Sequence, residues 1–237
     1  MDPVNRTPAA PYGMAPAATA ERVTTFLRTV YGWMCAGLAI TALVAYSIAS
    51  TGMAQVLVAN YLLFIGLAVA QIGIVFYLSA RVSRIEPGTA TLLFIGYAAL
   101  TGVTLSVLVL TYTGTSIATT FVVTAGMFGA LALYGTTTSR SLAGAGQFFY
   151  MGLIGLVLAS IVGIFWHSQA LQFLISVVGV IVFTGLTAWD AQRLKQMAAE
   201  LPAGQVGSYA IVGALSLYLD FINLFLFLLR FMGGRRE

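Results

Sequence analysis

Seven stretches of mostly apolar residues, each about twenty residues long, follow one another along the chain. A helix of about that length crosses the hydrocarbon core of a bilayer. Spanning β-barrels instead use strands with alternating apolar and polar residues, and the runs Leu174–Val182 and Phe221–Leu229 do not alternate. We therefore predict an all-α integral membrane protein with seven transmembrane helices. The predicted spans are Phe26–Ser50, Ala59–Ala80, Thr89–Tyr112, Ser116–Thr137, Gln147–Trp166, Leu171–Ala191 and Tyr209–Phe231.

The composition excludes several other classes of protein. Charged residues make up 8% of the 237 residues, against about 25% in soluble domains, so a soluble enzyme domain is excluded. The net charge of +4 is spread singly or in pairs, which gives no basic face for nucleic acid. Cys35 is the only cysteine, so the chain forms no internal disulfide. No phosphate loop, HExxH or GxSxG motif stands at a span end, and we predict neither enzymatic activity nor a cofactor.

The segments outside the spans suggest one domain and its orientation. Residues 1–20 are rich in Ala, Pro and Thr, and we expect a disordered cytoplasmic tail followed by a single membrane domain at 21–237. Basic residues mark the cytoplasmic side of membrane proteins. Those near span ends all fall on the side of the N-terminus, which is therefore predicted to be cytoplasmic: Arg6, Arg22, Arg28, Arg81, Arg84, Arg140, Arg193 and Lys195. Arg235 and Arg236 break the rule, because seven full crossings would place them on the opposite side from the other basic residues. The last span therefore either crosses fully against the rule or re-enters, which would keep this end of the chain in the cytoplasm.

Two acidic residues lie within the predicted spans, where a carboxylate costs on the order of 2.5–3.5 kcal/mol. Asp190 is at the end of the sixth span and Asp220 is deep in the seventh. Steps of three and four residues place most polar groups of the seventh span on one helical face with Asp220. A polar face must contact protein or water, so it is either a packing seam or part of an ion path. The face contains Tyr209, Gly213, Ser216, Asp220, Asn223, Phe227 and Arg230.

The residues alone leave open whether the two acids meet. A straight hairpin with about seventeen loop residues offsets them by about 16 Å, and Asp190 could instead be hydrated or pair with Arg193. If they meet, two close carboxylates share one proton and form a pH-dependent latch. Without that proton, they repel, recruit an arginine or bind a divalent cation such as calcium. Arg81 and Arg84 are the basic partners considered. Gln71 could line a cavity or bond a neighbouring helix.

The same two regions carry a resemblance to a known family. Ala214–Phe225, continued by Leu228–Phe231, resembles the closing signature of the Bax inhibitor-1 family, the transmembrane Bax inhibitor motif proteins. Phe183–Lys195, with Trp189 before Asp190, resembles the sixth-helix motif of that family. Tyr31–Met34 and Phe76–Arg81 are also similar, so the likeness to a bacterial-type member covers about residues 22–234.

The resemblance implies a specific fold and function. It implies that the seventh helix is central in the bundle, and that the protein is a pH-sensitive calcium leak gated by a pair of aspartates. By position these are Asp190 and Asp220, with Arg81 as the basic partner and Arg84 as the alternative. The resemblance also implies a Glu at the position where this chain has Gln71, so a cation step that depends on that acid would be altered here.

We therefore expect a proton-regulated calcium channel of the bacterial inner membrane. Its gate is Asp190, Asp220 and Arg81, the two acids being possible calcium ligands, and its path candidates are Ser216, Asn223 and Gln71. The expected partners are the lipid bilayer, calcium and protons, with no nucleic acid. A proton-coupled solute carrier and a non-transporting regulator of stress response or membrane proteolysis are the alternatives.

Overall fold

The computed structural model describes residues 16–166, 168–201, 205–234 and 236. These residues form helices and connections and contain no strand. Seven of the helices are long and apolar enough to cross a membrane, which confirms the predicted all-α fold with seven spans. The helices are α1 (Pro16–Ser50), α2 (Met53–Ala59), α3 (Tyr61–Arg81), α4 (Pro87–Thr111), α5 (Gly114–Thr137), α6 (Ala143–Phe165), α7 (Gln169–Glu200) and α8 (Val206–Met232).

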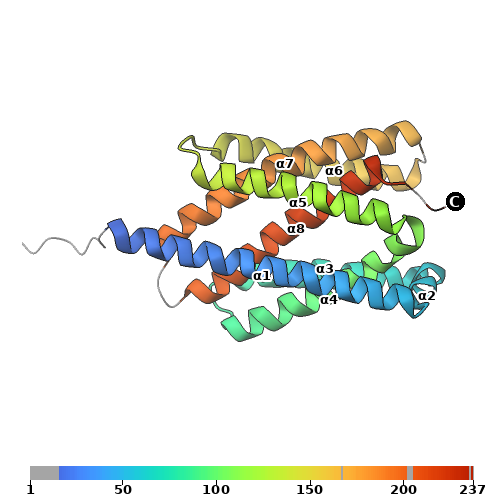
Figure 1. Cartoon of the computed structure of the whole chain (residues 1–237), viewed down its shortest axis with the longest axis horizontal. Coiled ribbons are helices and arrows are strands. Elements are labelled where there is room, and N and C mark those ends of the chain that lie inside the picture. Colours follow the sequence, from blue (N-terminus) through green and yellow to red (C-terminus); the bar gives the residue numbers. More distant parts are fainter. Residues whose placement is uncertain (1–15, 167, 202–204, 235, 237) are drawn as a thin grey trace, which may run out of the picture.

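Helix α8 is central, as expected for the seventh span. It runs diagonally between a group formed by α5, α6 and α7 and a group formed by α1, α3 and α4 (Figure 1). In its most apolar 18-residue window 67% of the residues are buried, against 39% in α7 and 6% in α3. Of the seven candidate spans, α8 is therefore the most buried.

Aromatic side chains of α8 pack against helices of both groups. The Tyr218 ring lies edge-on to Phe94 and Tyr97 of α4, each at 5.8 Å between centroids. On the other side Phe221 packs against Phe121 at 5.3 Å and Phe128 at 5.5 Å, both on α5. Such aromatic pairs add about 0.5–1.5 kcal/mol each beyond the area that they bury.

Glycine allows the closest helix approaches. A methyl group at Gly102 of α4 would stand 2.7 Å from the Thr41 carbonyl oxygen of α1. At Gly135 of α5 it would overlap the Ala188 carbonyl oxygen of α7. Small residues at these crossings let the backbones pack closely, which is how helices associate where the hydrophobic effect does not drive them together.

The ends of α8 show that it runs the full depth of the bundle. Near its start, Ser208 Oγ donates to the Ile85 carbonyl in the α3–α4 connection, at 2.7 Å. Beyond its end, the Thr113 N–H between α4 and α5 donates to the Gly234 carbonyl, at 3.2 Å. The two connections lie at opposite ends of α4, so α8 crosses as α4 does and does not re-enter.

In three places the helices differ from the predicted spans by more than four residues. Helix α7 continues to Glu200 rather than ending at Ala191. Its last turns contain charged residues, but they also bury apolar residues such as Leu194 and Ala198. The short helix α2 was not predicted. Helix α1 begins at Pro16, within the segment predicted to be a disordered tail, and residues 1–15 of that segment lie outside the described residues.

Candidate functional site

The long helix α7 brings Asp190 level with Ser216. Asp190 lies ten residues before the end of α7 (200 − 190), and Ser216 lies ten residues after the start of α8 (216 − 206). Only residues 201–205 join the two helices, instead of the seventeen loop residues expected from the sequence. The hairpin estimate of about 16 Å between the acids was therefore wrong, since Asp220 is one turn, or about 6 Å, beyond Ser216.

A hydrogen bond joins the two helices at this level. The Ser216 hydroxyl donates to Asp190 Oδ2, and Asp190 is only 8% exposed. Ser216 and Asp220 are four residues apart and lie on the same face of α8. The face predicted from the sequence therefore meets Asp190 through Ser216.

Asp220 is buried slightly more deeply than Asp190 and has an oxygen atom without a hydrogen-bond partner among the described residues. Its side chain is 6% exposed, and its Oδ2 atom is buried with no hydrogen-bond partner among the described residues. The carboxyl group lies close enough to Asp190 for the two to interact electrostatically. A buried acceptor without a partner costs about 1–3 kcal/mol, so Asp220 Oδ2 carries an unmet demand for a hydrogen bond in this structure.

A cavity of about 290 Å³ opens beside Asp190, between α3, α7 and α8. Asp190 and Ser216 line it, together with Ser79 of α3. Arg193, one turn after Asp190, also lines the cavity and interacts electrostatically with Asp190. The guanidinium of Arg193 stacks on Trp189 at 5.5 Å from the ring centroid. Asp190 therefore shares this cavity with a basic side chain.

A second hollow, of about 260 Å³, lies one turn farther along α8, between α6, α7 and α8. Asn223 and Phe227 line it, and the Asn223 amide donates to the Leu219 carbonyl at 2.8 Å. Asp220 lies between the stretch of α8 that lines the first cavity and the stretch that lines this hollow. The polar face predicted from the sequence thus faces a hollow on each side of Asp220.

The other predicted residues do not contact the acid pair. Arg81 is exposed, and its guanidinium lies 5.7 Å from the Tyr77 ring centroid. Arg84 is exposed in the α3–α4 connection. Gln71 donates to the hydroxyls of Thr101 and Thr104 of α4, both at 3.3 Å. In this structure the basic side chain that interacts electrostatically with Asp190 is therefore Arg193.

A buried polar contact between α8 and α1 was also not predicted from the sequence. The hydroxyls of Tyr218 in α8 and Thr41 in α1 are 2.6 Å apart, and Thr41 also donates to the Ala98 carbonyl at 2.9 Å. Tyr218 stands two residues before Asp220 and points to the other side of α8. Its place inside the closing signature was the only sequence signal for it.

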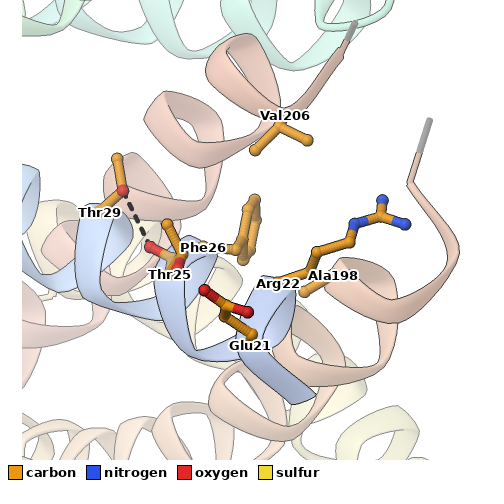
Figure 2. Close-up of a pocket in the computed structure, with 7 residues that line it drawn as sticks. All are labelled: Glu21, Arg22, Thr25, Phe26, Thr29, Ala198 and Val206. Carbon is orange, nitrogen blue, oxygen red and sulfur yellow. Dashed lines mark hydrogen bonds between the residues drawn. The ribbon is translucent and has the colours of Figure 1, made fainter. Parts of the chain in front are cut away.

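A separate cavity of about 350 Å³ lies between the start of α1, the end of α7 and the start of α8 (Figure 2). Its charged lining residues are Glu21 and Arg22, and the Phe26 ring points into it. Arg22 donates to the Leu201 carbonyl at 2.5 Å. Neither aspartate lines this cavity, so it is distinct from the site at Asp190 and Asp220.

Comparisons with known proteins assign the chain to a family. A family model described as "Inhibitor of apoptosis-promoting Bax1" matches residues 23–237. The chain is 50% identical over 216 residues to the inner membrane protein YbhL of Escherichia coli, covering 90% of this chain and 92% of that protein. It is 44% identical over 215 residues to an uncharacterized protein of Borreliella burgdorferi (90% and 93% covered), and 43% identical over 223 residues to the uncharacterized protein RP147 of Rickettsia prowazekii (92% of each). The chain is thus an integral membrane protein that belongs to the Bax inhibitor-1 family.

Proposed function

We propose that the protein is a pH-sensitive calcium leak in which Asp190 and Asp220 share a proton and form the gate. One observation carries this proposal: Asp220 Oδ2 is buried without a hydrogen-bond partner, within electrostatic range of Asp190. A packing role would be served by Asn or Ser, which bring no charge into the membrane. An acid with an unpaired oxygen next to a second acid is suited to exchanging a proton or a cation.

The chemistry of the pair gives the direction of the pH response. A proton shared between the carboxyl groups cancels one of two adjacent negative charges. When the proton leaves, the charges repel each other or bind a hard cation through their oxygens. Protons and calcium therefore compete for the pair, and calcium flux should fall as the pH is lowered.

The charged and titratable groups around the pair come from three helices. Arg193 of α7 and Tyr209 of α8 line the cavity, and Arg81 is two residues after Ser79 on α3. We propose Arg81 as the switching partner that pairs with the deprotonated acids. Leu78 is the only buried residue of α3 within the described chain, so a shift of α3 toward the cavity disturbs little packing.

The proposed ion path follows the polar face of α8. Calcium would enter the cavity at Asp190 and Ser216, pass Asp220 and leave by the hollow at Asn223. Two carboxylates and a hydroxyl supply fewer oxygens than the six to eight that hold calcium tightly, which suits a transported ion. Gln71 bonds to α4 outside both hollows, so nothing supports a place for it on the path.

The proposed location is a bacterial inner membrane, with the N-terminus in the cytoplasm. The name of the E. coli relative supports the membrane, and the one-sided distribution of basic residues supports the orientation. Both are open to direct measurement, for example by labelling single cysteines introduced on either side of the Cys35→Ser protein.

Liposomes loaded with a calcium dye and containing the purified protein test the function. A calcium leak gives flux that decreases from neutral to acidic pH and shows no counterflow. Saturation and counterflow with an organic solute would identify a proton-coupled carrier instead. A well-folded protein that gives no flux of either kind would leave the non-transporting regulator as the better account.

A further inference from the structure

A polar hollow of about 360 Å³ lies between the α5–α6 connection, the last turns of α7 and the start of α1. It is at the end of the bundle where α1 begins (Figure 1). Arg140 and Lys195 are its charged lining residues, and no acidic residue among those described lines it. Most of the other lining residues carry a hydroxyl or an amide: Thr138, Ser139, Ser141, Gln192 and Gln196. The hollow therefore gathers two positive charges among hydrogen-bonding groups.

The hollow is closed off from the apolar hollow between α5, α6 and α7, with which it shares no lining residue. The α5 and α7 backbones touch at Gly135, where a methyl group would overlap the Ala188 carbonyl. Beside this contact Gln192, only 6% exposed, ties the α5–α6 connection to α7: it accepts from the Leu142 N–H at 2.8 Å and donates to the Arg140 carbonyl at 2.8 Å. A ligand of the hollow is therefore a compact polar group and not an acyl chain.

Neither cation is neutralised by an acid among the described residues. The Arg140 guanidinium makes no hydrogen bond or ion pair with them, although the backbone of Arg140 bonds to Thr138 and Gln192. Lys195 Nζ donates to the Thr136 carbonyl at 2.6 Å, which leaves two of its three N–H groups for a ligand. The Arg140 backbone and the Lys195 ammonium are thus held in place, while charged donors of both residues are open to a ligand.

Such a donor set selects an anion with several oxygens. A phosphate group carries nearly two negative charges near neutral pH and three or more acceptor oxygens, whereas a carboxylate has one charge and two oxygens. A guanidinium binds phosphate through paired N–H groups, and a lysine ammonium acts as a point charge. The serine hydroxyls supply further donors. Phosphate matches both cations at once.

We propose that this hollow binds a phosphate group, held by the Arg140 guanidinium and the Lys195 ammonium. Inorganic phosphate, a soluble phosphomonoester and the headgroup of a phospholipid all present this group, and competition separates the sources. The hollow shares no lining residue with the cavity at Asp190, so the proposal stands independently of the calcium leak.

Isothermal titration of inorganic phosphate into the full-length protein tests the site, in a maltoside detergent that contains no phosphate and with chloride keeping the ionic strength constant. Wild-type protein should bind phosphate saturably. Arg140→Gln should weaken the affinity at least about tenfold, because it removes a charged hydrogen-bond donor. The substitution deletes no side-chain contact among the described residues, and thermal unfolding without phosphate checks that the variant is folded. No saturable binding to wild-type protein, or an unchanged affinity of folded Arg140→Gln, would overturn the proposal.

Arg84→Gln is the matched control, because it removes an exposed basic residue of the α3–α4 connection, outside the hollow. This variant should bind phosphate as wild type does. An equal loss of affinity in Arg84→Gln would attribute the binding to general surface charge and overturn the site.

Competition with lipid identifies the source of the phosphate. Phosphatidylglycerol and oleate both add negative charge to the detergent micelle, but only phosphatidylglycerol carries phosphate. Displacement of inorganic phosphate by phosphatidylglycerol and not by oleate would support the site and assign it to a lipid headgroup. Displacement by phosphatidylglycerol no greater than that by oleate would support the site as one for a soluble phosphate.

Discussion

Ser216 of α8 donates a hydrogen bond to Asp190 of α7, and Ser216 stands four residues, or one helical turn, before Asp220. The bond joins the sixth and seventh spans at the inner end of a cavity that opens to α3. The two acids thus come from two helices that this serine bond joins.

Replacing Ser216 by Ala should destabilise the protein by about 1 kcal/mol and change the pH profile of calcium flux, because Asp190 loses its hydrogen-bond donor. Ser208→Ala is the matched control, since it removes another serine bond of α8, to the Ile85 carbonyl. The control should lower stability by a similar amount and leave the pH profile as in wild type. Thermal unfolding and dye-loaded liposomes measure the two properties. Identical pH profiles for Ser216→Ala and wild type would show that the bond only supports packing.

Replacing Arg81 by Gln should alter the pH profile of flux if Arg81 pairs with the deprotonated acids. Arg84→Gln removes the neighbouring exposed charge and serves as its control. A larger effect of Arg84→Gln would transfer the role to that residue. If neither variant differs from wild type, then Arg193, which interacts with Asp190 in this structure, becomes the basic partner of the pair.

Replacing Gly135 by Ala should destabilise the bundle by about 1–3 kcal/mol, because the added methyl group overlaps the Ala188 carbonyl and forces α5 away from α7. Gly129→Ala is the control on the same helix, where a methyl group meets nothing within 4 Å. It should be neutral or stabilising by up to about 1 kcal/mol, since Ala favours the helix. Equal unfolding temperatures for the two variants would contradict the close α5–α7 contact.

Replacing Tyr218 by Phe should cost about 1 kcal/mol of stability, because it deletes the hydroxyl that contacts Thr41 and keeps the ring between Phe94 and Tyr97. The pH dependence of flux should not change, since this hydroxyl lies on the other side of α8 from Asp220. A lost pH response in a stably folded Tyr218→Phe protein would place the tyrosine in the gate.

The sequence was sufficient for the spans and for the two acids. Uninterrupted apolar stretches predict membrane helices directly, and a carboxylate within such a stretch is rare enough to mark a site. The α7–α8 register was not predictable in the same way. Charged residues after Ala191 end the apolar stretch but do not end the helix, because Leu194 and Ala198 still bury one face. The extra turns of α7 decide where Asp190 lies relative to α8.

Tertiary contacts explain the remaining differences. The Gln192 amide that holds the α5–α6 connection and the Tyr218–Thr41 contact join residues far apart in the chain. Neither has a local pattern from which it could be predicted. Arg81 illustrates the opposite case, because its position in the resembling motif predicts a role, while its side chain lies outside against Tyr77 in this conformation.

The measurement that tests the central claim most directly is calcium flux through Asp220→Asn protein in dye-loaded liposomes, from neutral to acidic pH. Asn keeps the shape of the side chain and removes the titratable group. Wild-type flux should fall on acidification, because protons compete with calcium for the pair, and the flux of Asp220→Asn should no longer depend on pH. A folded Asp220→Asn protein whose flux keeps the wild-type pH dependence would contradict the shared-proton gate.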